Sequence, residues 1–422
     1  MDQAFEGIAE MTSEVMIMNR QAVVLAADSA VTYGGGPEPV VTLEAEKILP
    51  LSETIALMVY SRGDVLGRSW SHIAHAFNRE HGAREFESVR DCADAFFAFL
   101  DKNRRLFPEA EENAEFEALM RAAFLTVLSH AKAMLNYPGA GYEGDADAFE
   151  AALDLYLEHL AQDEAGAERQ RLDVFESFDR RAFYERYGPM IDALIRDSLG
   201  EFGMAEAMRA KLFDFAYLIA TQPAFLEPYA GLVFAGFGEG DVFPVYAHYY
   251  ASIFVDGVMK RAHDETTAVG VDEGPNAYLR TFAQAEMTHA FLRGVHPLLF
   301  DVMISLNLIT NEAAAEAALK EAGLGEAEMD AVLQRMRAEA LPRLTGEFVN
   351  AAQAISQDEF INPFIKVVSA SGKKQLAETA KALVELNILK SDLHMSQTGV
   401  GGDVDVVMVS RTGGVEWYAK KS

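Results

Sequence analysis

The sequence predicts an α+β fold in which a sheet core contains large helical insertions. Apolar runs typical of strands occur at both ends of the chain and again near its middle. Long stretches with helical periodicity lie between them. Because strands and helices are segregated rather than alternating regularly, an α+β architecture is favoured over a parallel α/β sheet.

The N-terminal part predicts four strands. Two of them flank a turn at Asn19-Arg20-Gln21, and the second, from Ala22 to Ala27, is apolar throughout, as expected for a strand covered on both faces. A loop rich in glycine and proline follows over residues 31–39. The next two strands are expected at residues 47–51 and 54–60.

The remaining elements follow from the same patterns. Helices are expected over residues 64–103 and over most of the stretch that follows, to about residue 222. Further helices are expected over residues 276–360 and 373–389. Strands are expected at residues 229–237, 242–253, 403–410 and 414–419, the last two forming a hairpin.

Composition and charge exclude several classes of protein. The 422 residues suffice for two or three domains, or for one domain with large insertions. Half of the residues are hydrophobic, so a disordered chain is excluded. The net charge of −29 repels nucleic acid and anionic lipid, so neither is an expected partner.

Cysteine usage and the first residues indicate a cytoplasmic protein. Cys92 is the single cysteine, which excludes an intrachain disulfide, and its amphipathic helical context predicts a small buried core residue. No run of about 18 consecutive apolar residues is present, and residues 1–11 lack the apolar region of a secretory signal. No motif predicts a metal or an organic cofactor.

Three side chains at the ends of the N-terminal strands suggest chemistry. Thr12, Asp28 and Lys47 can converge at one sheet edge. A threonine hydroxyl becomes a nucleophile when a base, such as its own free α-amine, accepts its proton. A lysine stabilises the developing negative charge, an aspartate positions the lysine, and backbone N–H groups near Ser61 and Gly63 can form an oxyanion hole. The alternative is a threonine and an aspartate at strand ends with a surface lysine.

These segments resemble the proteasome β-type subunits and the HslV peptidase, which are N-terminal-nucleophile (Ntn) hydrolases. The spacing from Thr12 to Asp28, the segment Lys47-Ile-Leu-Pro-Leu and the segment 54–64 match the family's opening strands and turn. Residues 232–238 resemble a mid-chain strand, and residues 375–384 with 399–409 resemble the last helix and strand. The whole pattern is most similar to bacterial proteasome-like proteins with helical insertions.

The resemblance implies a four-layer αββα sandwich of antiparallel sheets. Its core is expected to comprise residues 12–103, 223–275 and 361–422. The two large helical insertions are then residues 104–222 and 276–360, and residues 1–11 form a tail or propeptide.

Carried over to this sequence, the resemblance makes Thr12 the nucleophile, Lys47 the residue that tunes its hydroxyl and Asp28 the residue that positions Lys47. Two positions depart from the family pattern: Met11 precedes Thr12 where a glycine is usual, and Ser61 stands at the glycine of the oxyanion turn. Supporting residues from the last helix-to-strand turn are expected among Asp392, Ser396 and Thr398.

The expected function is that of a threonine peptidase or amidohydrolase acting through an acyl ester on Thr12. Its amine becomes free if translation starts at Met11 and that methionine is removed, or if residues 1–11 are cleaved as a propeptide. The expected substrate is a peptide or a small amide. A homo-oligomer is possible, although the insertions crowd the faces that a proteasome ring uses. The alternatives are an inactive scaffold with an unprocessed N-terminus and a self-processing precursor without a further substrate.

Overall fold

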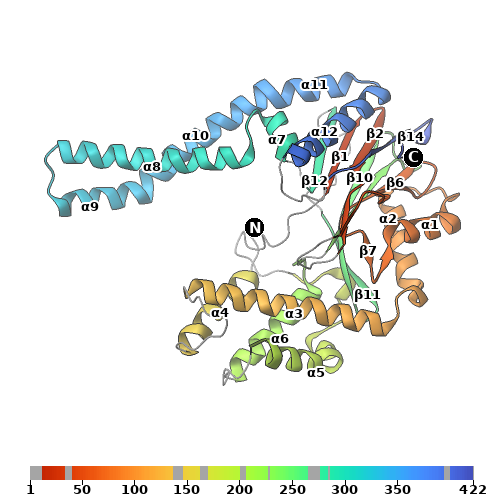
Figure 1. Ribbon diagram of the computed structural model, residues 1–422, viewed down its shortest axis with the longest axis horizontal. Coiled ribbons are helices and arrows are strands. Elements are labelled where there is room, and N and C mark those ends of the chain that lie inside the picture. Colours follow the sequence, from red (N-terminus) through yellow and green to blue (C-terminus); the bar gives the residue numbers. More distant parts are fainter. Residues whose placement is uncertain are drawn as a thin grey trace. The chain divides into compact units, whose positions relative to one another are not determined.

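The computed structural model describes residues 12–33, 40–135, 146–161, 170–199, 206–226, 229–264, 276–283, 286–393 and 400–421. The chain divides into two compact units. The first unit comprises Met1–Glu10 and Ala45–Val269, and the second comprises Met11–Glu44 and Gly270–Ser422. Each unit contains one five-stranded antiparallel sheet and several helices (Figure 1), which confirms the α+β class.

The sheet of the second unit brings both ends of the chain together. Its strand order is β12-β1-β2-β13-β14, and every neighbouring pair is antiparallel. The strands are β1 (Ser13–Asn19), β2 (Ala22–Asp28), β12 (Ala277–Ala283), β13 (Val404–Ser410) and β14 (Gly414–Ala419).

Helix α12 (Lys373–Leu393) covers one face of this sheet. Alternate residues of β1 and β2, including Val15, Ile17 and Val24, pack with Leu376, Ala380 and Val384 of α12 in one buried cluster. The opposite face is also apolar, since Met16, Met18, Val23 and Leu25 are fully buried. The sequence is therefore apolar on both faces of β1 and β2, as the continuous run from Ala22 predicts.

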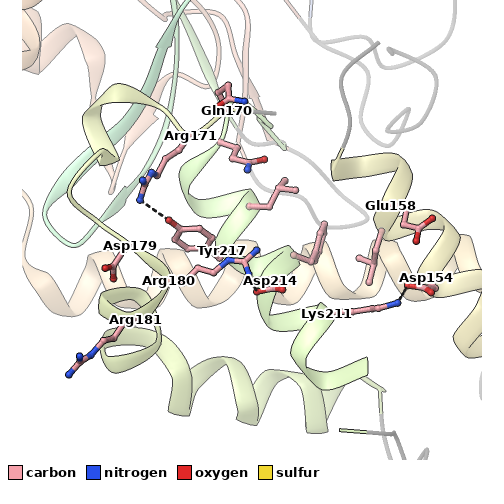
Figure 2. Close-up of a pocket in the computed structure, with 14 residues that line it drawn as sticks. Asp154, Glu158, Gln170, Arg171, Asp179, Arg180, Arg181, Lys211, Asp214 and Tyr217 are labelled. Carbon is pink, nitrogen blue, oxygen red and sulfur yellow. Dashed lines mark hydrogen bonds and ion pairs between the residues drawn. The ribbon is translucent and has the colours of Figure 1, made fainter. Parts of the chain in front are cut away.

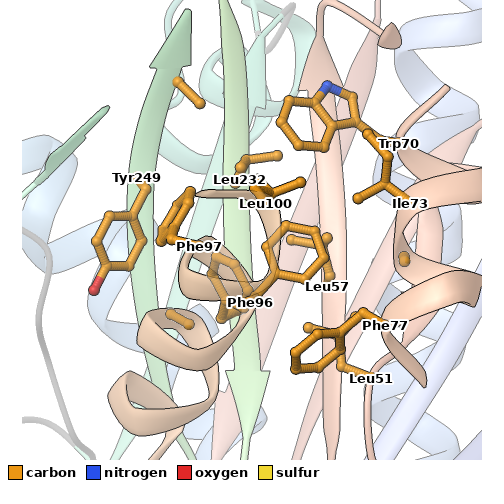
Figure 3. Close-up of a cluster of buried hydrophobic side chains, with 14 of the residues drawn as sticks. Leu51, Leu57, Trp70, Ile73, Phe77, Phe96, Phe97, Leu100, Leu232 and Tyr249 are labelled. Atoms are coloured by element: carbon orange, nitrogen blue, oxygen red, sulfur yellow. The ribbon is translucent and has the colours of Figure 1, made fainter. Parts of the chain in front are cut away.

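The sheet of the first unit has the strand order β11-β10-β9-β6-β5. The strands are β5 (Ile48–Pro50), β6 (Ile55–Ser61), β9 (Ala230–Gly236), β10 (Val245–Val255) and β11 (Val258–His263). Helices α1 (Trp70–His81) and α2 (Val89–Lys102) pack on one face. Aromatic side chains dominate this core, in which Phe97 of α2 meets Tyr249 of β10 edge to face (Figure 3). Phe96 and Phe97 also meet Phe234 of β9 edge to face.

The first helical insertion has a hydrophobic core of its own. Its helices are α3 (Glu109–Met134), α4 (Ala146–Ala161), α5 (Arg180–Leu199) and α6 (Glu206–Thr221), with short 3₁₀ turns at Arg104–Leu106 and Asp173–Phe175. Ile253 and Val255 at the end of β10 belong to the same cluster, so the insertion is anchored on the sheet's longest strand.

The second insertion is a helical hairpin. Helix α7 (Glu286–Arg293) leads to the long α8 (Pro297–Glu321), and α9 (Glu326–Arg335), α10 (Leu341–Ser356) and α11 (Asn362–Ala370) form the returning arm (Figure 1). Single π-helical turns at Met336–Ala340 and Gln357–Ile361 join the three returning helices. A proline follows each π turn. Proline has no backbone N–H to donate, and the wider π turn accommodates this missing hydrogen bond within the helix.

Three stretches differ from the expected elements. Residues 277–283, expected to begin a helical block, form the edge strand β12, whose half-exposed mixture of residues lacks the buried run of a central strand. Residues 31–33 form β3 with β4 (Val40–Thr42) instead of a loop, while residues 34–39 lie outside the described part. A small hairpin of β7 (Asp64–Val65) and β8 (Arg68–Ser69) precedes α1.

The boundary expected between residues 360 and 361 falls inside a continuous run of helical turns. Within the described residues, one helix, α8, is long and apolar enough to cross a membrane by length and composition. None of its apolar window is buried. Polar residues, among them Asp301, Ser305 and Asn307, interrupt α8, so the expectation that no run of about 18 consecutive apolar residues is present still holds.

We predict that Cys92 is unreactive in the folded chain. The side chain is fully buried between α2 and the sheet, and burial raises the pKa of its thiol to about 12 against an opposing effect of Arg84. Labelling with an aromatic disulfide reagent at pH 8 is expected to be at least 100-fold slower than in 6 M guanidinium. Equal rates in the two conditions would show that the thiol is accessible.

Candidate active site around Thr12 and Asp28

Thr12 lies directly before β1 and is almost completely buried, at 4% exposure. Its hydroxyl Oγ1 donates a hydrogen bond to Oε2 of Glu14 at 3.1 Å. Side chains two residues apart on a strand share a face, so Thr12 and Glu14 lie side by side on the face opposite α12. A buried carboxylate is thus in direct contact with the candidate nucleophile.

Asp28 ends β2 beside the start of β1 and is also buried. Its Oδ1 accepts the backbone N–H of Ser13 at 3.0 Å, and its Oδ2 accepts the backbone N–H of Gly401 at 3.0 Å. Each bond is charge-assisted, which makes it roughly twice as strong as a neutral one. Asp28 therefore fixes the residue next to Thr12 and the turn that precedes β13.

Glycine is required beside this carboxylate. Gly402 has a φ of +79°, and a Cβ at this position would come within 2.5 Å of Oγ of Ser29. Only glycine adopts this backbone conformation at no steric cost. The tripeptide from Gly401 to Asp403 thus brings the backbone of the last strand close to Asp28.

On the face of β1 that packs against α12, the side-chain amide of Asn387 holds the strand. Asn387 of α12 donates from Nδ2 to Oγ of Ser13 at 2.9 Å and to Oγ1 of Thr288 at 3.0 Å. All three side chains are buried. The start of β1 is therefore fixed by Asp28 through the backbone and by Asn387 through the neighbouring hydroxyl.

Lys47, Ser61 and Gly63 belong to the first unit. Lys47 is buried and immediately precedes β5, and its carbonyl accepts the N–H of Val59 at 2.9 Å. Ser61 ends the neighbouring strand β6, so Lys47 and Ser61 lie at the same end of two paired strands. The structure thus brings together Thr12 with Asp28 in one unit, and Lys47 with Ser61 and Gly63 in the other.

Ser61 adopts an unusual backbone conformation. Its φ is +63°, in the left-handed region that glycine occupies readily and other residues rarely. The turn that follows is well held: Arg62 donates its N–H to the carbonyl of Tyr229 at 3.1 Å, and Gly63 accepts from Trp70 at 3.1 Å. A strained residue in a fixed turn is typical of sites where backbone N–H groups are directed for function.

The side chain of Arg62 ties this turn to the first helical insertion. Its guanidinium pairs with Asp64 at 3.4 Å and closely with Glu115 of α3. Burial acts to lower the pKa of Arg62, but the two carboxylates outweigh it and the pKa is raised. The pKa of Glu115 is raised mainly by burial. The insertion is therefore connected to the segment expected to form the oxyanion hole.

Three residues were expected to support the site from the last helix-to-strand turn. Asp392 is exposed near the end of α12, and Ser396 and Thr398 lie outside the described residues. The residue that the sequence analysis missed is Glu14. A charged residue directly before the apolar run from Val15 to Met18 was the signal that could have identified it.

A pocket of about 750 Å³ lies within the first helical insertion (Figure 2). Four basic and four acidic side chains line it, and two of each pair with one another: Arg180 lies 3.2 Å from Asp214, and Lys211 pairs with Asp154. Arg171 donates to the hydroxyl of Tyr217 at 3.0 Å. Because these charges compensate one another, the pocket does not favour a ligand of one sign.

Across the described residues, no cluster of three or more histidine, cysteine, aspartate or glutamate side chains is arranged to bind a metal ion. No known family model matches the chain, and no curated protein matches it significantly.

We predict that Asp28→Asn destabilises the fold by about 2–3 kcal/mol, because it weakens two buried charge-assisted hydrogen bonds. Urea denaturation followed by circular dichroism measures the effect. Asp392→Asn, at an exposed site, is the matched control and is expected to change stability by less than about 0.5 kcal/mol. Equal effects of the two substitutions would refute a structural role of Asp28.

Proposed function

We propose that this chain is an N-terminal-nucleophile threonine hydrolase that cleaves an amide bond through Thr12. The observation on which the proposal chiefly rests is the position of Thr12. Its hydroxyl contacts the buried Glu14, while Asp28 and Asn387 hold the adjacent Ser13. A nucleophile within hydrogen-bond distance of a base, on a strand fixed from both faces, is the arrangement that nucleophilic catalysis needs.

Ser61 supports the same proposal from the first unit. The Ntn hydrolases that the chain resembles have a glycine at this position, and Ser61 adopts the positive φ that favours glycine. The local backbone thus has the conformation expected of an oxyanion turn although the residue differs. A backbone N–H donor does not depend on the side chain, so the serine is compatible with the role.

The four-layer αββα sandwich is part of the proposal. Each unit is an antiparallel sheet with helices on one face. The second face of each sheet is buried: Met16 and Leu25 lie on one, and Met58 and Val233 on the other. Apolar sheet faces must be covered, and stacking the two sheets would cover both at once. The resemblance implies that Lys47 acts on Thr12.

The first chemical step in this account is self-cleavage. Oγ1 of Thr12 attacks the carbonyl carbon of Met11 and transfers its proton to Glu14. The C–N bond between residues 11 and 12 then breaks, the nitrogen takes up the proton, and an ester links residue 11 to Oγ1. Water hydrolyses the ester, leaving the carboxylate of Met11 and a free α-amine on Thr12.

Substrate turnover then follows the same bond changes. The α-amine of Thr12 accepts the hydroxyl proton, Oγ1 attacks the substrate carbonyl, and backbone N–H groups near Ser61 and Gly63 stabilise the oxyanion. The protonated amine donates to the leaving nitrogen as the amide bond breaks. Water releases the acyl group from Thr12, and the ammonium of Lys47 stabilises negative charge on Oγ1.

A specific observation favours the scaffold alternative. Helix α8 exposes a row of large apolar side chains, which is typical of an interaction surface rather than of a monomeric enzyme. In that alternative residues 1–11 are retained and Thr12 never gains a free amine. The state of the N-terminus therefore separates the two functions.

We predict that the natively expressed chain loses residues 1–11, and that Thr12→Ala retains them. General acid–base groups contribute typically about 10²–10⁴-fold. Glu14→Gln is therefore expected to slow the cleavage at least 100-fold while leaving the fold intact. Intact-mass analysis and N-terminal sequencing over a time course measure both effects.

Glu44→Gln is the matched control, because it makes the same carboxylate-to-amide change at an exposed position outside the site. It is expected to be processed within a few-fold of the wild-type rate. A tail retained in the wild-type chain would refute the hydrolase proposal. Loss of the tail in Thr12→Ala as well would show that cleavage is not self-catalysed.

Lys47 gives a separate test that involves the first unit. We predict that Lys47→Ala lowers hydrolysis of a fluorogenic peptide amide at least 100-fold by removing the cation that stabilises Oγ1. Lys366→Ala, on the helical arm, is expected to leave the rate unchanged. Wild-type activity in Lys47→Ala would remove this residue from the mechanism.

A further inference from the structure

A tyrosine, a histidine and an aspartate form a buried hydrogen-bonded group next to the turn at Ser61. The hydroxyl of Tyr60 lies 2.8 Å from Nε2 of His248, and Nδ1 of the same ring lies 3.2 Å from Oδ2 of Asp264. His248 is fully buried and Tyr60 is 5% exposed. All three residues belong to the first unit, and the mechanism proposed for Thr12 uses none of them. We call this group the Tyr60 triad.

The Tyr60 triad lies on the face of the sheet opposite helices α1 and α2. Val59 and Tyr249, which adjoin two of its members in the chain, pack with those helices, and successive residues of a strand point to opposite faces. Tyr60 of β6 lies opposite Gly231 of the intervening strand β9, while His248 lies on β10. The tyrosine ring therefore crosses β9 to reach the histidine.

Glycine at position 231 makes this crossing possible. A Cβ on Gly231 would come within 1.9 Å of Cε1 of Tyr60. The tyrosine occupies the space that any other side chain would fill, and its ring stacks on His248 with the centroids 5.7 Å apart. Tyr250 adds an edge-to-face contact to the same histidine at 4.7 Å. The position of Tyr60 is thus fixed by packing as well as by its hydrogen bond.

Asp264 fixes the orientation and the tautomer of His248. Its backbone N–H donates to the carbonyl of His248 at 2.9 Å, and its side chain accepts from Nδ1 of the ring, so the two residues are joined twice. An ionised carboxylate only accepts hydrogen bonds, so it assigns the proton to Nδ1 and leaves Nε2 as an acceptor. The hydroxyl of Tyr60 is then the donor to Nε2.

The Tyr60 triad acts on the turn through one peptide unit. The planar peptide between residues 60 and 61 carries the N–H of Ser61, and its orientation depends on the backbone at Tyr60 and on φ of Ser61. A φ of +63° persists in a residue other than glycine only where the surrounding structure imposes it. Hydrogen bonds of Arg62 and Gly63 hold the turn on its C-terminal side. The triad holds the residue that precedes it.

We propose that Tyr60 is a positioning residue for the oxyanion turn, held in place by His248 and Asp264. The inference rests on the proposed hydrolase activity, because a directed N–H of Ser61 has a catalytic consequence only where an oxyanion forms. Such a donor stabilises the transition state more than the bound substrate. Loss of the positioning hydrogen bond therefore lowers kcat and leaves KM nearly unchanged.

Tyr60→Phe tests the proposal, because it removes the hydroxyl and keeps the ring over Gly231. We expect kcat for a fluorogenic peptide amide to fall at least 10-fold, with KM within about twofold of the wild-type value. Hydrogen–deuterium exchange, followed by mass spectrometry in the absence of substrate, is expected to be at least 10-fold faster in peptides that cover residues 59–65.

Tyr156→Phe is the matched control. Tyr156 is also buried and stacks on a histidine, His130, at 4.7 Å, but its hydroxyl has no hydrogen-bond partner among the described residues. Both measurements are expected to match the wild type in this variant. Unchanged exchange in Tyr60→Phe, faster exchange with an unchanged kcat, or equal effects of the two substitutions would each overturn the proposal. A wild-type chain without amidase activity would refute the hydrolase proposal, while the exchange experiment still decides whether Tyr60 holds the turn.

Discussion

The carboxylate of Asp28 is the constraint on which the candidate site depends. It accepts one N–H from Ser13 and one from Gly401, so it joins β1, β2 and the approach to β13 at a single buried point. These segments come from opposite ends of the chain. Without an acceptor there, two buried N–H groups would lose their partners, which is costly in a protein interior. The position of Thr12 follows from this junction, because its neighbour is fixed.

Glu14 changes the chemistry that is expected of Thr12. A free α-amine is the usual base in the Ntn hydrolases that the chain resembles. In the unprocessed chain, the nitrogen of Thr12 is part of a peptide bond and cannot act as this base. The hydrogen bond from Thr12 to Glu14 provides a proton acceptor at that stage. One strand thus holds a nucleophile and two possible bases, which act before and after self-cleavage in our account.

The sequence predicted most of the secondary structure because the signals were local. The apolar run from Ala22 and the amphipathic pattern around Cys92 each determine their element without reference to the rest of the chain. Strand β12 was mistaken for a helix because an edge strand lacks a buried run and is stabilised by its pairing with β1. The spacing predicted Thr12, Asp28 and Lys47 at one sheet edge, which is right for Thr12 and Asp28 and wrong for Lys47, because Lys47 precedes a strand of the other sheet. The hydrogen bonds to Ser13 and Gly401 could not be predicted, because they depend on tertiary register.

The most direct test of the central claim is to identify the residue that reacts with a threonine-directed electrophile. Native protein is treated with a β-lactone or a peptide epoxyketone, digested and mapped by mass spectrometry. We expect one adduct, on Thr12, in wild-type and Glu44→Gln chains and none in Thr12→Ala. Failure of the processed wild-type chain to form an adduct at Thr12 would contradict the claim that this residue is a nucleophile.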